Sequence, residues 1–447
     1  QRVRPTVVIF VLVWMLVSIP TAGAEPGEPG DPVRLNGTFV SGGDVFQGGF
    51  EVAPDSNRVV YRADQNTDFV YELFSVPVGG GTADRLNEAL PTGGSVFNFE
   101  ISPDSSRAVY LADENADNVF ELFSVPIGGG SSVTLNGSLV TDGDVGGSFR
   151  ISPDSSRVVY LADQDIDGVN ELYSVPLTGG TATKLNPDLV SGRAVFQGFA
   201  ISPDSSRVIY RADQDTNDVI ELYSVPIAGG TATRINGNMI AGGDMGPQFS
   251  ISADSSRVVY RADQDTDTVD EVFSVPITGG TATKLNGALP DGAEANDFVV
   301  SADSTTVVYN ADLNVVDVDE LFSVSIAGGS STPLNGTLVA NGDVLDLAIS
   351  PDSSTVVYRA DQNTDDAFEI FAVPIGGGSA VRLNNPLVSG REVRGDFQIT
   401  GDSNRVVYRA DEDLLNADDL FTVPLTGGTP RKLNTPVGSD QDVTCLL

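Results

Sequence analysis

The chain of 447 residues contains no histidine and a single cysteine, Cys445. The absence of histidine excludes Ser-His-Asp and Cys-His nucleophile arrangements, histidine-ligated zinc and proton transfer by imidazole. One cysteine forms neither an internal disulfide nor a thiolate metal site. Enzymes that depend on these groups are therefore excluded.

Basic residues are also scarce. The chain has 25 Lys and Arg against 62 Asp and Glu, a formal net charge of -37. A nucleic-acid partner is excluded because phosphate backbones require a basic protein face. Charged residues make up only 19% and hydrophobic residues 40% of the chain. This composition indicates a globular protein rather than an acidic disordered one.

The first residues have the pattern of a targeting segment. Arg2 and Arg4 precede an apolar run over 7–19, and Ala22 and Ala24 supply the small residues of a cleavage site. The pattern predicts a secretory signal peptide over 1–24. A membrane anchor is the alternative, but the run is shorter than the ~20 residues that span a bilayer. We expect an exported protein, periplasmic or extracellular in a bacterial-type envelope, with no membrane span after cleavage.

The rest of the chain is one unit repeated. Asp154 follows a proline in the third copy, and its equivalents recur at intervals of 49 or 50 residues. They are Asp55, Asp104, Asp204, Asp254, Asp303, Asp352 and Asp402. The eight copies occupy 37–434, after a short segment over 25–36.

Each copy has the pattern of four short strands. In the third copy these are 149–151, 157–160, 171–175 and 183–185, rich in β-branched and aromatic residues. A Pro-Asp-Ser-Ser turn joins the first two strands, and a Gly-Gly-Thr turn joins the last two. A four-stranded unit of this length repeated eight times predicts an all-β fold, a β-propeller of eight blades. Six or seven blades with extra copies, or a truncated longer propeller, are the alternatives.

The repeat also resembles a known family. A Pro-Asp-Ser motif after an apolar strand, an aromatic third strand and a Gly-Gly turn resemble the TolB-like, WD40-like propeller repeats, from about Val33 to Asn434. The resemblance implies the propeller fold. TolB itself resembles a six-bladed propeller behind an α/β domain, so its own role is not implied here.

The two ends of the repeat region bear on ring closure. Residues 33–36 look like a spare fourth strand, and 443–447, within the tail 435–447, fall where a ninth copy would begin. We expect copies one to eight to close into one ring, with this tail as an overhang or the start of a further strand.

Acidic residues recur in the loops between the second and third strands. Six of the eight loops fit Asp-x-Asp/Asn-x-Asp/Asn-x-x-x-Glu, a spacing that brings together oxygen ligands for calcium and resembles the calcium loops of integrin-type propellers. A solvated acidic turn without metal is the alternative. The candidate ligands are Asp163, Asp165, Asp167 and Glu171; Asp213, Asp215, Asn217 and Glu221; and Asp263, Asp265, Asp267 and Glu271.

The first strands offer few catalytic residues. At the variable position of this strand only Glu51 and Glu100 are acidic, beside Arg150, whereas a channel-centred hydrolase would need several converging carboxylates. We therefore expect a monomeric, non-catalytic module that binds a protein or an envelope polymer through its acidic loop face. The alternatives are a calcium-assisted hydrolase or lactonase and a purely structural envelope component.

Overall fold

A computed structural model describes residues 33–414 and 417–434. The predicted signal peptide over 1–24 and the tail over 435–447 lie outside the described residues. Within the described ranges, no helix has the length and apolar character needed to cross a membrane.

The described residues form eight antiparallel sheets of four strands, one sheet for each sequence copy. We number these sheets as blades one to eight. Blades one to four contain β1 (Val45–Val52), β2 (Arg58–Ala63), β3 (Glu72–Pro77), β4 (Asp84–Arg85), β5 (Val96–Ile101), β6 (Arg107–Ala112), β7 (Glu121–Pro126), β8 (Val133–Thr134), β9 (Val145–Ile151), β10 (Arg157–Ala162), β11 (Glu171–Pro176), β12 (Thr183–Lys184), β13 (Ala200–Ile201), β14 (Arg207–Ala212), β15 (Glu221–Pro226) and β16 (Thr233–Arg234). Blades five to eight contain β17 (Met245–Ile251), β18 (Arg257–Ala262), β19 (Glu271–Pro276), β20 (Thr283–Lys284), β21 (Ala295–Val300), β22 (Thr306–Ala311), β23 (Glu320–Ser325), β24 (Thr332–Pro333), β25 (Val344–Ile349), β26 (Thr355–Ala360), β27 (Glu369–Pro374), β28 (Val381–Arg382), β29 (Gln398–Ile399), β30 (Arg405–Leu414), β31 (Ala417–Pro424) and β32 (Arg431–Lys432).

The turns that define each blade form as their residues require. Ser155, in the Pro-Asp-Ser-Ser turn, has φ of 60°, and the Asp154 carboxylate accepts a hydrogen bond from the backbone N–H of Ser156 at 3.0 Å. Gly179 and Gly180 have φ of 90° and 140°, values that glycine adopts without strain. The predicted strands and turns are confirmed.

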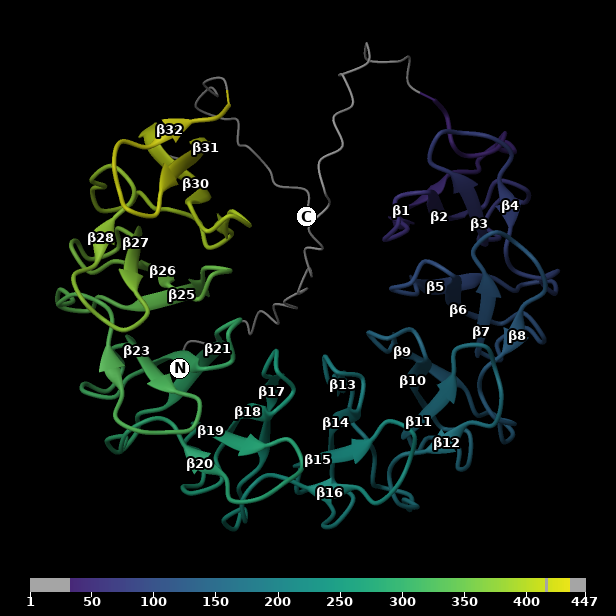
Figure 1. Cartoon of the computed structure of the whole chain (residues 1–447), viewed down its shortest axis with the longest axis horizontal. Helices are drawn as coiled ribbons and strands as arrows, with labels where there is room; N and C mark the ends of the chain where they lie inside the picture. The colour runs from purple at the N-terminus through teal and green to yellow at the C-terminus, as the bar shows by residue number, and fades with distance from the viewer. Residues whose placement is uncertain (1–32, 415–416, 435–447) are drawn as a thin grey trace.

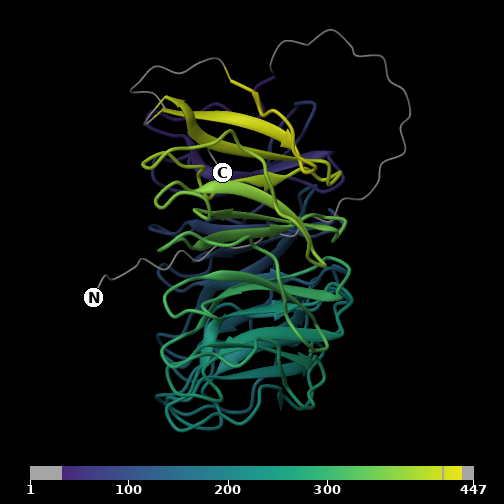
Figure 2. The same ribbon diagram turned by 90° about the vertical axis from the view of Figure 1, so that its left-hand side faces the viewer.

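The blades stand around a central axis with their first strands innermost, as the labels β1, β5 and β9 show in Figure 1. Figure 2 shows the same stack of sheets from the side. All eight copies are blades, so the eight-bladed propeller is confirmed and the alternative of six or seven blades with extra copies is wrong.

The apolar core lies between blades. Val109 and Leu122 of blade two pack against Phe149 and Tyr160 of blade three, and every interface between successive blades repeats this arrangement. Tyr160 is fully buried and its ring stacks on Tyr173 of its own blade, with ring centroids 5.5 Å apart. Each blade therefore depends on its neighbours for burial, as in other repeat proteins.

The ring is open in this structure, contrary to our expectation of closure. Blades one and eight lie apart in Figure 1. Phe50 of blade one is 61% exposed, whereas its equivalent Phe149 is 1% exposed. Leu433 of blade eight is 45% exposed, whereas Leu185 at the same position is 1% exposed. The end blades each lack a neighbour on one face.

The segment 33–36, which we expected to be a spare fourth strand, is not a strand in the structure, although it lies on blade one where the fourth strand of a preceding blade would lie. A Cβ atom added at Gly80 would meet Val33 Cγ1 at 2.6 Å. At the equivalent Gly179, an added Cβ would meet Val133 Cγ2 of blade two at 3.3 Å. Val33 therefore packs on blade one as a strand residue of one blade packs on the next.

Candidate functional site

The acidic loops lie where the sequence predicts, beside the connections between blades. The first carboxylate of each loop ties the two segments together. In blade three, Asp163 Oδ1 accepts the backbone N–H of Asp144 at 2.6 Å, and Oδ2 accepts that of Gly168 at 2.8 Å. Its equivalents Asp213 and Asp263 accept the backbone N–H groups of Ala194 and Asp244. These carboxylates already have structural hydrogen bonds.

The glutamates of the three candidate calcium loops in blades three, four and five are also ion-paired. Glu171 is buried, and its Oε1 lies 3.1 Å from Lys184 Nζ. The same lysine lies 2.7 Å from Asp165 Oδ2. Glu221 pairs with Arg234, and Glu271 pairs with Lys284, which also reaches Asp265.

These pairings bear on whether the loops fit a cation. Among the described residues, no three acidic side chains are grouped so that they could hold a metal ion. Asp167, Asp215, Asn217 and Asp267 belong to the same loops without completing such a group. Calcium binding stays a prediction that the structure does not test, and the loop-face partner and monomeric state are equally untested.

A second set of polar residues lies on the inner strands. Glu51 of β1, Glu100 of β5 and Arg150 of β9 occupy the same position in three consecutive blades. Glu51 Oε2 accepts the backbone N–H of Ile101 at 3.4 Å, and Glu100 accepts that of Ile151 at 3.3 Å. Each glutamate thus reaches across to the inner edge strand of the next blade, where backbone groups would otherwise be unpaired.

The two carboxyl groups differ from ordinary glutamates. Burial raises the pKa of Glu100 to about 7, although the backbone N–H of Ile151 and the charge of Arg150 oppose this rise. Burial also raises the pKa of Glu51, against the hydrogen bond from Ile101. The charge of Glu51 contributes to the raised pKa of Glu100, so the two groups influence each other. Such a pair can donate and accept protons near neutral pH.

A pocket between blades one and two adjoins Glu51, whereas Glu100 is not among its lining residues. It has a volume of about 180 Å³ and is lined by Phe46, Gly48, Gly49, Glu51, Arg62, Phe97, Asn98 and Phe99. Arg62 is buried, with 8% of its surface exposed. Its guanidinium carbon is 3.7 Å from the centroid of the Phe46 ring.

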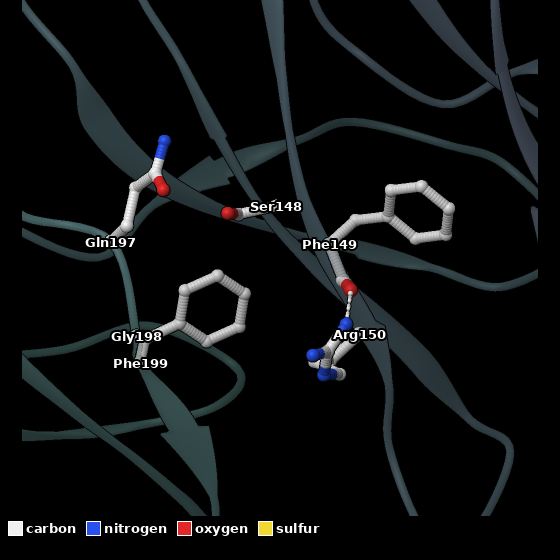
Figure 3. Close-up of a pocket in the computed structure, with 6 residues that line it drawn as sticks. All are labelled: Ser148, Phe149, Arg150, Gln197, Gly198 and Phe199. Atoms are coloured by element: carbon white, nitrogen blue, oxygen red, sulfur yellow. Dashed lines mark hydrogen bonds between the residues drawn. The ribbon is translucent and has the colours of Figure 1, made fainter. Parts of the chain in front are cut away.

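A smaller pocket of about 90 Å³ lies between blades three and four. Figure 3 shows Gln197 and Phe199 along one side and Ser148 and Arg150 along the other. Arg150 donates a hydrogen bond to the carbonyl oxygen of Phe149 at 2.8 Å. Arg150 lines this pocket, and its positive charge lowers the pKa of Glu100.

Sequence reasoning weighed Glu51, Glu100 and Arg150 as too few for a site, and it missed Arg62. Arginine recurs at this strand position in blades four, five, seven and eight, so Arg62 looked ordinary. The available signal was the residue before the third strand, which is Tyr71 in blade one but Asp270 in blade five.

Comparison with known proteins gives the fold. No family model matches the sequence, and no curated protein matches it either. A dipeptidyl peptidase 4 from Porphyromonas gingivalis is 10% identical with a TM-score of 0.57, over 86% of this chain and 59% of that one. A putative TolB from Agrobacterium tumefaciens is 18% identical with a TM-score of 0.32, over 53% of this chain and 79% of that one. An oligogalacturonate lyase from Vibrio parahaemolyticus is 14% identical with a TM-score of 0.40, over 72% and 87%.

These comparisons correct one prediction and confirm another. Our prediction of a non-catalytic module is contradicted, because the similar structure with a TM-score of 0.57 is a dipeptidyl peptidase by name. At 10% identity this similarity shows the fold, and an activity of this chain is a matter for a proposal. The absence of histidine misled us, because carboxyl groups with raised pKa also transfer protons. The predicted family resemblance is confirmed at the level of fold: the eight four-stranded antiparallel sheets have the architecture of a TolB-like β-propeller.

Proposed function

We propose that the protein is a hydrolase that uses carboxyl groups on the inner strands of blades one and two. The observation that carries this proposal is the placement of Glu51, Glu100 and Arg150 at one position in three consecutive blades. Glu51 also lines the pocket between blades one and two, which gives a substrate a place beside this carboxylate.

The chemistry needs one proton donor and one proton acceptor. Glu100, with a pKa of about 7, is partly protonated at neutral pH and donates its proton to the leaving oxygen of the substrate. Glu51 accepts a proton from the attacking water. Water supplies a hydroxyl group to one fragment and a proton to the other, so atoms balance. Pairs of carboxyl groups with unequal proton affinity support the hydrolysis of glycosidic bonds in this manner.

Arg150 affects the pKa of Glu100 and takes no part in the reaction itself. Its positive charge lowers the pKa of Glu100, opposing the larger effect of burial. Without Arg150 the pKa of Glu100 would be higher, so Glu100 would hold its proton more tightly and donate it to the leaving oxygen less readily. We expect Arg150→Ala to raise the pKa of Glu100 further.

The test compares residues at the same position of the first strand in different blades. Purified protein is assayed with chromogenic aryl glycosides, aryl esters and lactones. For any substrate that is cleaved, Glu100→Gln should lower the rate by roughly 10²- to 10⁴-fold. Ser250→Ala, at the equivalent position of blade five, is the matched control and should leave the rate unchanged. A rate that survives both Glu100→Gln and Glu51→Gln, or no cleavage of any of these bonds, contradicts the proposal.

Export is part of the same proposal, since the apolar run over 7–19 has the length and flanks of a signal peptide. N-terminal sequencing of protein recovered from the periplasm or medium should begin at Glu25. Recovery only of protein that retains the run would contradict export with cleavage.

A further inference from the structure

Arg62 is a buried cation without a counter-ion. It is 8% exposed, it forms no ion pair within the described residues, and its Nε has no hydrogen-bond partner there. Two aromatic rings lie beside it: its Cζ is 3.7 Å from the centroid of the Phe46 ring and 5.6 Å from that of the Tyr71 ring. Guanidinium groups stay charged in proteins, so this charge is buried.

The other blades show how the same position is normally satisfied. Arg261 of blade five lies 3.3 Å from Asp270, and Arg409 of blade eight lies 2.8 Å from Asp396. In blades two and three the position holds leucine, as Leu111 and Leu161. Arg359 of blade seven also pairs, with Asp346, so the repeat places a paired arginine or an apolar residue here in five of the other seven blades. Arg211 of blade four forms no ion pair among the described residues, but it donates hydrogen bonds to the carbonyl oxygens of Gln197 and Gly246. Blade one keeps the arginine but has Tyr71 where blade five has an aspartate.

Burying an unpaired charge is costly, and proteins compensate it with an opposite charge or hydrogen bonds. The ring of Phe46 supplies a cation–π contact, which offsets only part of this cost. Arg62 lines the pocket between blades one and two, so an anion in that pocket would lie beside its guanidinium group.

The residues that line the pocket indicate which class of anion it would bind. Phe46 and Phe97 are both exposed aromatic rings of the lining. A guanidinium pairs best with a planar carboxylate, through two parallel hydrogen bonds. We propose that this pocket binds an organic carboxylate with a flat ring body, its carboxylate on Arg62 and its ring against Phe46 and Phe97. The binding of a carboxylate is inferred from Arg62 alone. The further step, that this carboxylate is the substrate of the hydrolase, rests on the proposed function.

Glu51 lines the same pocket and opposes an anion there. The net charge of -37 opposes it as well, although salt screens distant charges beyond about 8 Å. Glu51→Gln should therefore strengthen carboxylate binding while it weakens hydrolysis, a combination that a merely structural role of Glu51 would not produce.

The experiment uses benzoate as the probe and benzamide as its neutral match, with binding measured by ligand-observed NMR and calorimetry. Wild-type protein should bind benzoate and not benzamide. Arg62→Leu copies blades two and three, and Tyr71→Asp copies the aspartate of blade five that pairs with the arginine. Each should weaken benzoate binding about tenfold or more. Tyr71→Phe keeps the ring and should preserve binding. Melting temperatures confirm that each variant is folded.

The outcomes separate the two proposals. Equal binding of benzoate and benzamide, no benzoate binding by the wild type, or undiminished binding by both Arg62→Leu and Tyr71→Asp overturns the carboxylate site. Benzoate binding that depends on Arg62, without cleavage of any substrate, supports the site and contradicts the hydrolase. Cleavage that depends on Glu100, in a protein that does not bind benzoate, supports the hydrolase and overturns the site.

Discussion

The backbone N–H of Asp104 in blade two donates a hydrogen bond to the hydroxyl oxygen of Ser155 in blade three, at 3.0 Å. The same bond crosses all seven interfaces between successive blades. Ser155 presents its hydroxyl from a left-handed backbone conformation, with φ of 60°. The Pro-Asp-Ser-Ser turn is therefore a link between blades as well as a turn within one.

Removing this hydroxyl should weaken one interface. We expect Ser155→Ala to lower the free energy of unfolding by about 1 kcal/mol, the usual net contribution of one hydrogen bond. Ser56 is the matched control, because among the described residues it accepts no such bond from a preceding blade. Urea denaturation of both variants gives the measurement, and an equal loss for Ser56→Ala and Ser155→Ala would contradict the role of the link.

The raised pKa of Glu100 has a consequence for stability. The folded state binds this proton more tightly than the unfolded state, whose ordinary value is 4.5. Above that value the unfolded state ionises first, so the stability of the wild type falls as pH rises toward 7. Glu100→Gln removes this dependence. Denaturation at pH 4.5 and pH 7 should show a larger drop for the wild type than for Glu100→Gln, and parallel curves would contradict the raised pKa.

The same group should shape the pH profile of catalysis. With Glu100 as the proton donor, kcat/KM of the proposed hydrolase falls as pH rises through about 7. Arg150→Ala removes a positive charge that holds this pKa down, so the fall should move to higher pH. Initial rates from pH 5 to pH 9, with direct NMR titration of the carboxyl group, measure the shift. A shift to lower pH would contradict the assigned effect of Arg150.

The acidic loops allow a test that separates structure from metal binding. Asp163 holds two backbone N–H groups, so Asp163→Ala should cost about 1–3 kcal/mol with or without calcium. Asp165→Ala should remove most of the stability that calcium adds in this loop, and without calcium it should cost only the small contribution of its partly exposed ion pair with Lys184. The measurement is thermal melting in calcium and in sodium chloride of equal ionic strength. Identical melting of the wild type in both salts would remove the calcium prediction.

The fold was predictable because each blade repeats a local pattern of turns and alternating strands that needs no distant information. The roles of residues such as Tyr160, on a strand, and Gly179, in a turn, can be predicted from a single copy of the repeat. The site depends on what neighbouring copies place opposite each other. The isolation of Arg62 follows from Tyr71 standing where another copy has an aspartate, and a difference of one residue in a repeat is easily overlooked. Closure depends on the rotation between blades, which no single copy encodes.

The uncovered face at Phe50 gives blade one a special position in unfolding. A blade with one neighbour has only one stabilising interface, so the stack should fray from its ends as a one-dimensional array does. The pocket that contains Arg62 is lined by residues of blade one and blade two, so it lies at the interface between them. A ligand held there would fasten the end blade to the next one, so occupancy would slow backbone hydrogen exchange in β1 and β2 while leaving blade five unaffected.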